Sequence, residues 1–176
     1  MTRTAQARTA PEPKALKGAV DLLARTLASD ELPLGDRAML RRMTPFQRPP
    51  LAFFRLACRD LPADWEGQRR EWMTLVAGMA LMCPSPHRPD RPVGLALAEA
   101  GLSESRLERL LAAEGDVLST ILLRTAYLLG ANGMAANWVD FAGLLFAAER
   151  DEKENLRLAI ARDFYRPLDH NRQRRN

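Results

Sequence analysis

Residues 94–124 read GLALAEAGLSESRLERLLAAEGDVLSTILLR, and this stretch decides the fold. A short helix rich in Gly and Ala ends at Gly101, and Ser103 can cap a second helix that carries a leucine stripe. A third helix follows Asp116 and is apolar almost all round over 118–129. A helix of that kind is usually buried. The stretch therefore predicts a helical bundle with the 118–129 helix at its centre.

The same helical spacing extends over the rest of the chain. Further helices are predicted over 13–28, 36–43, 51–60, 65–82, 137–148 and 151–165. Asp36, Asp64 and Asn137 are the expected N-caps of three of them. In the 51–60 helix we expect one apolar face, made of Leu51, Phe54 and Cys58 with Phe53 and Ala57, and a second face that carries Arg55 and Arg59. No segment alternates with a period of two, so we predict an all-α protein without a sheet.

A proline-rich segment divides the chain. CPSPHRPDRP at 83–92 holds four prolines, which neither a helix nor a central strand tolerates. We expect a loop there, between an N-terminal helical lobe and a C-terminal helical bundle. The predicted organisation is a disordered arm over 1–12, the lobe over 13–83, the loop over 84–92, the bundle over 93–166 and a basic tail over 167–176.

Composition excludes several classes of protein. Cys58 and Cys83 have no metal-site or disulfide spacing, which predicts buried, reduced thiols in an intracellular protein. The N-terminus lacks the apolar region of a secretory signal, and no apolar run approaches the ~18 residues of a membrane span. We therefore expect a cytoplasmic protein without a membrane partner.

The charges are unevenly distributed. Residues 1–95 carry a net charge of +5, residues 96–161 carry −4, and residues 162–176 carry +3. This asymmetry fits a bound polyanion on one side and a protein partner on the other, and it fits a random surface equally well.

No catalytic constellation can be identified. His87 and His170 lie in a proline-rich loop and a polar tail, and no helix carries a metal-binding pair. There is no Gly-rich phosphate loop, and no serine lies near a base in the sequence. We predict a protein that is not an enzyme and that needs no cofactor or metal.

Several arginines occupy positions that fit phosphate contacts. Arg106 and Arg109 fall on one flank of the leucine stripe in the 103–113 helix, and Glu104 and Glu108 fall on the other. Arg106 also opposes its own helix dipole, which favours either a phosphate or a salt bridge as the reason for its position. Arg42 and Arg69 flank apolar stripes, Arg70 points to solvent, and Arg124 must pair or reach a surface because its helix is apolar. No aromatics are interleaved with these arginines, so we expect contacts to the nucleic-acid backbone with little base stacking.

Six motifs occur in an order that resembles a known family. They are LRRMTP (40–45), AFFRLA (52–57), VGLALAEAGLSESRLERLL (93–111), ILLR (121–124), NWVDFAGLL (137–145) and ARDFYR (161–166). Together they resemble the small, CasB-type subunit of the type I-E CRISPR surveillance complex, Cascade, over nearly the whole chain. The most specific are the Asp163-Phe164 pair and the element over Gly94–Ala98.

This resemblance implies an all-helical protein with an N-terminal lobe, a C-terminal four-helix bundle and no catalytic activity. Two copies would lie in Cascade beside the subunits that carry the crRNA, with the large subunit as a further partner. Their basic faces would hold the target and non-target DNA strands of the R-loop. R-loop exchange is nearly balanced, so contacts to the backbone can shift it.

The resemblance also assigns candidate residues. The family's basic positions match Arg41, Arg42, Arg69, Arg106 and Arg124, and our full set of nucleic-acid candidates adds Arg70 and Arg109. Two arginines expected from the family pattern are replaced by Ala112 and Thr125, and Arg109 is a candidate substitute. The main alternative is a helical protein–protein adaptor that uses its arginines only in salt bridges. A small all-α hydrolase is the third.

Overall fold

The structure is a computed structural model that describes residues 11–173, with side chains described as far as Arg166. Its helices are α1 (Pro13–Ala28), α2 (Leu34–Arg42), α3 (Leu51–Asp60), α4 (Arg69–Leu81, after a 3-10 turn over Trp65–Gln68), α5 (Val93–Glu99), α6 (Glu104–Ala112), α7 (Gly115–Ala131), α8 (Trp138–Phe146) and α9 (Arg150–Gln173). Within 11–173 there is no strand, only an isolated bridge between His87 and Ala136. The all-α prediction is confirmed for this part of the chain.

The two ends of the chain lie partly outside the described residues. Most of the predicted arm, residues 1–10, lies outside the described residues. The predicted basic tail begins inside a helix, because the backbone of α9 continues to Gln173 rather than ending near Tyr165. Residues 174–176 lie outside the described part.

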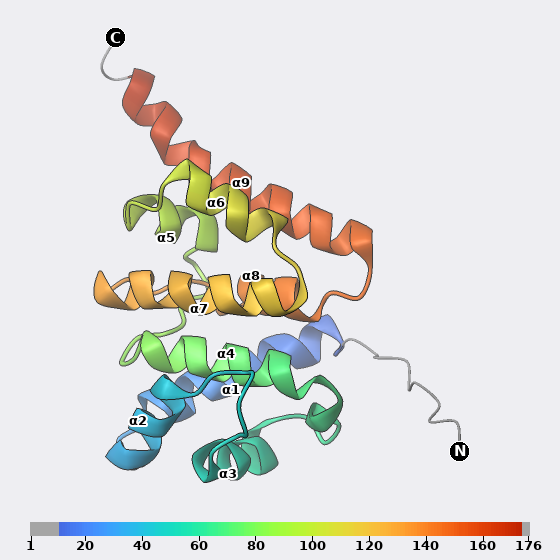
Figure 1. Cartoon of the computed structure of the whole chain (residues 1–176). Coiled ribbons are helices and arrows are strands. Elements are labelled where there is room, and N and C mark those ends of the chain that lie inside the picture. The colour runs from blue at the N-terminus through green and yellow to red at the C-terminus, as the bar shows by residue number, and fades with distance from the viewer. Residues whose placement is uncertain (1–10, 174–176) are drawn as a thin grey trace.

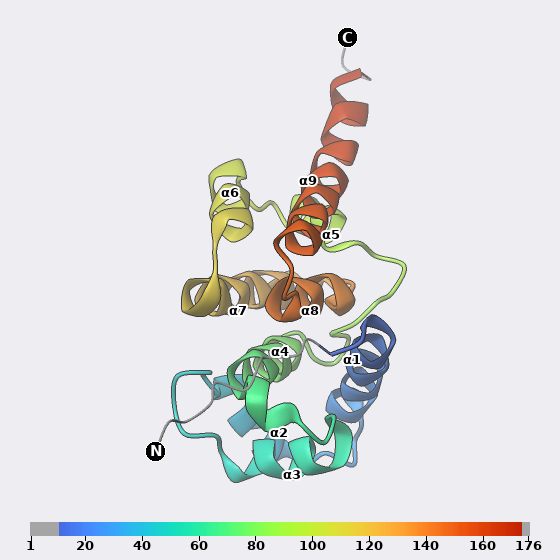
Figure 2. The same cartoon turned by 90° about the vertical axis from the view of Figure 1, so that its right-hand side faces the viewer.

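The helices form three tiers (Figure 1). α1 to α4 form the lowest tier, α7 and α8 the middle one, and α5, α6 and α9 the upper one, as the turned view also shows (Figure 2). α4 packs on α7, α1 packs on α8, and α5 makes its main contact with α9. One continuous hydrophobic core extends from Leu16 to Phe164 through all three tiers.

The most completely buried helix is α4 rather than α7. Every residue from Trp72 to Ala80 is buried, because α2 lies on one side of α4 and α7 on another. α7 buries one face but leaves Val117 60% and Tyr127 67% exposed. The prediction of an all-round buried helix over 118–129 is therefore wrong on one face. Apolar content alone could not show which side of that helix reaches solvent.

The predicted apolar face of α3 is only partly buried. Phe53 and Ala57 are buried, together with Ala52 and Leu56, whereas Leu51 is 72% exposed and Phe54 and Cys58 are also exposed. α3 carries two adjacent apolar stripes, and its position against α1 and α2 selects the second. Cys83 does match a partly buried thiol, and its Sγ lies 3.4 Å from the carbonyl oxygen of Leu27.

One of the four predicted N-caps is confirmed by a side-chain hydrogen bond. The side chain of Asn137 accepts a hydrogen bond from the backbone N–H of Val139 at 3.2 Å. Ser103 does occupy the N-cap position of α6, but its side chain makes no capping hydrogen bond. Asp36 lies inside the first turn of α2 and instead binds Arg55 at 2.6 Å. Asp64 precedes the 3-10 turn and makes no capping hydrogen bond.

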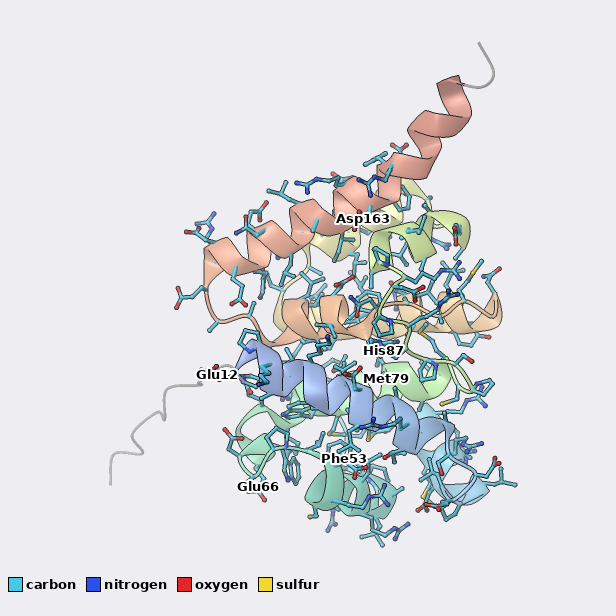
Figure 3. All side chains as sticks on the ribbon, turned by 180° about the vertical axis from the view of Figure 1, so that it is seen from behind. Glu12, Phe53, Glu66, Met79, His87 and Asp163 are labelled. Atoms are coloured by element: carbon cyan, nitrogen blue, oxygen red, sulfur yellow. The ribbon has the colours of Figure 1, made fainter. Side chains whose placement is uncertain are left out.

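The proline-rich loop is anchored through His87, which lies beside α1 at the back of the molecule (Figure 3). The imidazole is only 3% exposed. Its Nδ1 accepts a hydrogen bond from the backbone N–H of Trp138 at 3.0 Å, so Nδ1 carries no proton. Its Nε2 then donates to Oδ1 of Asp21 at 3.2 Å. Neutral His87 thus links the loop to α1 and to the start of α8.

Because His87 is buried and neutral, the free energy of unfolding is expected to fall as pH decreases below about 6.5. Burial lowers the pKa of His87 below its ordinary value of 6.5, against the opposing effect of Asp21, while Lys17 adds to the lowering. The unfolded chain then binds a proton that the folded chain excludes, so acid favours unfolding. Urea unfolding between pH 5 and pH 7 measures this effect. His87→Asn keeps an acceptor for the Trp138 N–H without this titration. An equal pH dependence in that variant would contradict the assignment.

Candidate nucleic-acid interface

Three candidate arginines line one concavity between α6 and α7, which we call the arginine groove. It has a volume of about 380 Å³ and is lined by Arg106 and Arg109 from α6, by Arg124 from α7, and by Leu102, Ile121, Thr125 and Leu128. The leucine stripe of α6 fixes this arrangement, because Leu107 and Leu110 are buried and turn the arginine flank toward α7. The groove thus has a largely apolar floor and a cationic rim.

The arginines of this groove are not neutralised by neighbouring side chains. Arg106, Arg109 and Arg124 are exposed, and none of them forms an ion pair with a residue of the described chain. Arg109 makes one hydrogen bond, from its Nε to the carbonyl oxygen of Ser105 at 3.3 Å. The salt-bridge explanation for Arg106 therefore finds no support within 11–166. Three like charges around a small concavity create a local positive potential that favours an anion.

The opposite flank of α6 is acidic, as its sequence predicts. Glu104 and Glu108 line a separate concavity of about 650 Å³ against α9, together with Glu154. We call this the acidic groove. Ala112 lies in the acidic groove, so an arginine there would not have joined the arginine groove. Thr125 does line the arginine groove, where it is 5% exposed and its hydroxyl donates to the carbonyl oxygen of Ile121 at 2.9 Å.

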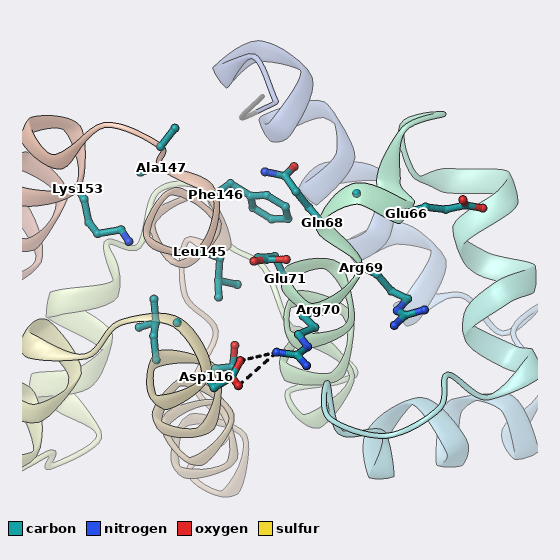
Figure 4. Close-up of a pocket in the computed structure, with 15 residues that line it drawn as sticks. Glu66, Gln68, Arg69, Arg70, Glu71, Asp116, Leu145, Phe146, Ala147 and Lys153 are labelled. Atoms are coloured by element: carbon teal, nitrogen blue, oxygen red, sulfur yellow. Dashed lines mark hydrogen bonds and ion pairs between the residues drawn. The ribbon is translucent and has the colours of Figure 1, made fainter. Parts of the chain in front are cut away.

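Arg69 and Arg70 lie at the start of α4, on a wider and electrically mixed concavity of about 760 Å³ (Figure 4). Nη1 of Arg70 lies 3.0 Å from Oδ1 of Asp116 at the start of α7, and both side chains are more than half exposed. Exposed pairs of this kind contribute at most about 1 kcal/mol to stability. Arg69 makes no ion pair with a described residue, and its guanidinium points away from Asp116.

Arg41 and Arg42 lie at the last turn of α2. Nε of Arg42 donates to the carbonyl oxygen of Ala38 at 3.2 Å. Burial raises the pKa of Cys83, and the charges of Arg37 and Arg41 oppose this shift, so Arg41 lies near Cys83 beyond the far end of α4. The 13 residues of α4 span about 20 Å. Arg41 and Arg69 are thus near opposite ends of α4, and the candidates form three separate groups.

The sequence interpretation missed Lys153, which lines the same concavity as Arg69 and Arg70. Its Nζ binds the Glu114 carboxylate at 2.6 Å, and this hydrogen bond lowers the pKa of Glu114. Arg157 binds the same carboxylate. In the sequence, Lys153 is distinguished only as a single lysine in the acidic first turns of a predicted helix. Its contact with Glu114 depends on where α9 lies relative to the start of α7, which the sequence does not show.

The described part of the chain contains no group of three or more His, Cys, Asp or Glu side chains that could hold a metal ion. None of its helices combines the length and the apolar character that crossing a membrane requires.

Comparison with known proteins adds the family. The model of the CRISPR-associated protein Cse2 family matches residues 36–165, which is most of the chain. The matched range includes all seven candidate arginines, both grooves and the two motifs at Gly94–Ala98 and Asp163-Phe164. The curated proteins contain no match. The chain therefore belongs to the Cse2 family, the CasB-type small subunit of the type I-E CRISPR Cascade complex.

Proposed function

We propose that this chain is a non-catalytic, nucleic-acid-binding subunit of Cascade that holds DNA strands and so stabilises the crRNA-guided R-loop. The observation that carries this proposal is the arginine groove, where Arg106, Arg109 and Arg124 meet without an ion pair to any described residue. Guanidinium groups bind phosphate oxygens through paired hydrogen bonds and remain charged at any physiological pH.

The proposed mechanism is a shift in a nearly balanced equilibrium. The RNA–DNA hybrid of an R-loop is about as stable as the DNA duplex that it replaces. Contacts from the three arginines to backbone phosphates release counterions and add a favourable free energy to the open state. Two further pairs would contact either a longer stretch of the same strand or a second strand. They are Arg69 and Arg70 at one end of α4, and Arg41 and Arg42 near the other.

A role in protein–protein contact has its own observation in the acidic groove. This groove carries Glu104, Glu108 and Glu154, and its one cation, Arg157, is paired with Glu154 and Glu114. Its net negative charge repels a polyanion. If the arginine flank of α6 faces nucleic acid, this flank suits another Cascade subunit, either the large subunit, a crRNA backbone subunit or a second copy of this chain. The adaptor alternative is thereby included as one side of the proposed subunit. We further propose a cytoplasmic location, where the DNA and crRNA are found.

The proposal is tested by measuring binding of the purified chain to a fluorescent 20-nucleotide single strand over a range of salt concentrations. For single strands, the logarithm of affinity falls by about 0.7 per phosphate contact for each tenfold rise in salt. Three arginine contacts predict a slope of about −2 or steeper. A response independent of salt would leave only the adaptor role.

A further inference from the structure

We infer that Tyr127 forms a stacking site for an unpaired nucleobase at the edge of the arginine groove. This inference rests on the proposed function and goes beyond it, because it gives the groove a preference for single strands over duplex. It is carried by the exposure of the Tyr127 ring and by its position relative to Arg124.

The ring of Tyr127 is 67% exposed, the most exposed large aromatic side chain among the described residues. Phe46 follows at 48%, and two further exposed aromatics lie against neighbouring rings. Phe54 contacts Phe53 and Trp65, and Tyr165 contacts Phe164 at 5.3 Å between ring centroids. Tyr127 makes no ring contact and no hydrogen bond with any residue of the described chain. Most of the side chain is therefore accessible to a ligand.

Arg124 and Tyr127 are three residues apart on α7 and so lie on the same side of the helix. Side chains at this spacing have Cβ atoms about 5–6 Å apart. Arg124 also forms part of the arginine groove, so Tyr127 stands next to the charges that would hold phosphates. A cationic track beside an aromatic ring is the arrangement by which proteins bind single strands.

The chemistry selects the ligand class. A strand held at its phosphates by Arg124 and its neighbours can turn a base outward onto the ring of Tyr127. In a duplex the bases are already stacked and paired, so the ring gains nothing from them. Stacking on an aromatic face is tolerant of base identity. Tyr127 would thus favour unpaired DNA or RNA of any sequence.

This inference differs from the expectation of backbone contacts with little base stacking. That expectation followed from the absence of aromatics interleaved with the candidate arginines. Since α7 packs on α4 with its other face, Tyr127 projects outward beside Arg124. The exposed side of α7 is the fact that the sequence did not reveal.

The test uses the full chain with two fluorescent probes of equal length, a 20-nucleotide oligothymidine and a 20-base-pair duplex. Tyr127→Leu is expected to weaken binding of the single strand by about fivefold or more, from the usual contribution of one stacked base. Its affinity for the duplex and its salt slope should stay the same, because no charge is removed. Tyr127→Phe keeps the ring and should bind like the original chain.

Tyr165→Leu is the matched control, since it removes the only other tyrosine, which lies in the acidic groove. It should leave both affinities unchanged. A single strand carrying 5-iodouracil should in addition form a photo-crosslink at Tyr127, located by mass spectrometry. If Tyr127→Leu binds the single strand as tightly as the original chain, the stacking site is refuted while the proposed function stands. If the original chain shows no salt-dependent binding, both fail.

Discussion

Replacing Arg106, Arg109 and Arg124 together with glutamine is expected to weaken single-strand binding by about a hundredfold at 0.1 M salt. Each phosphate contact to a single strand contributes about 0.7 to the salt slope. Three lost contacts therefore make the slope shallower by about 2. With equal affinities of the two chains at 1 M salt, this difference amounts to about two decades of affinity at 0.1 M. Fluorescence anisotropy over a salt series gives both the slope and the affinity.

The matched control for this experiment is a second triple variant with the same change in net charge. Arg25, Arg150 and Arg162 are exposed and lie outside the arginine groove. Their replacement by glutamine should change affinity far less. Equal losses in the two variants would mean that net charge alone governs binding. Neither variant should unfold, because substitutions of exposed side chains usually change stability by less than about 0.5 kcal/mol each.

Gly94→Ala is expected to destabilise the fold by about 3 kcal/mol or more, at the upper end of the cost of overpacking a core. A Cβ atom on Gly94 would overlap the carbonyl oxygen of Ile160 and lie 2.7 Å from the backbone nitrogen of Phe164. These two groups belong to the backbone of α9, so no rotamer change can relieve the clash. The midpoint of thermal unfolding should fall by about 6–12 °C in a chain of this size.

A second Gly→Ala substitution serves as a control, because it is expected to raise stability rather than lower it. Gly18 is exposed within α1, and an added Cβ would meet nothing within 4 Å. Gly18→Ala should therefore stabilise the protein by about 1 kcal/mol, the usual difference between Gly and Ala in a helix. If Gly94→Ala also raised the unfolding temperature, α5 and α9 would not be packed as closely as described.

Gly94 also explains why two motifs distant in the sequence belong together. The Cβ of Asp163 lies 2.9 Å from the position that a Cβ on Gly94 would take. The element over Gly94–Ala98 and the Asp163-Phe164 pair thus meet where α5 packs on α9. As sequence patterns they indicated only a family, and their contact gives them a shared structural role.

Helical spacing alone located most of the helices. The ends of α1 and α3 agree with their predicted ranges, because prolines and charged residues limit those apolar stripes at the sequence level. The opposed flanks of α6 were also determined by sequence, since one helical turn fixes the angles between Arg106, Glu108 and Arg109. The separate arginine and acidic grooves confirm that segregation.

The tertiary structure decided which apolar faces are covered and which arginines meet. Whether Leu51 or Phe53 faces the core depends on where α1 and α2 lie, and a single helix contains no such information. The same reason holds for Tyr127 on α7. Arg124 joins Arg106 and Arg109 only because α7 packs beside α6. Arg41 and Arg69 are separated by the length of α4, which is about 20 Å. Local periodicity determines the direction of a side chain on its own helix, and only packing between helices determines what that side chain meets.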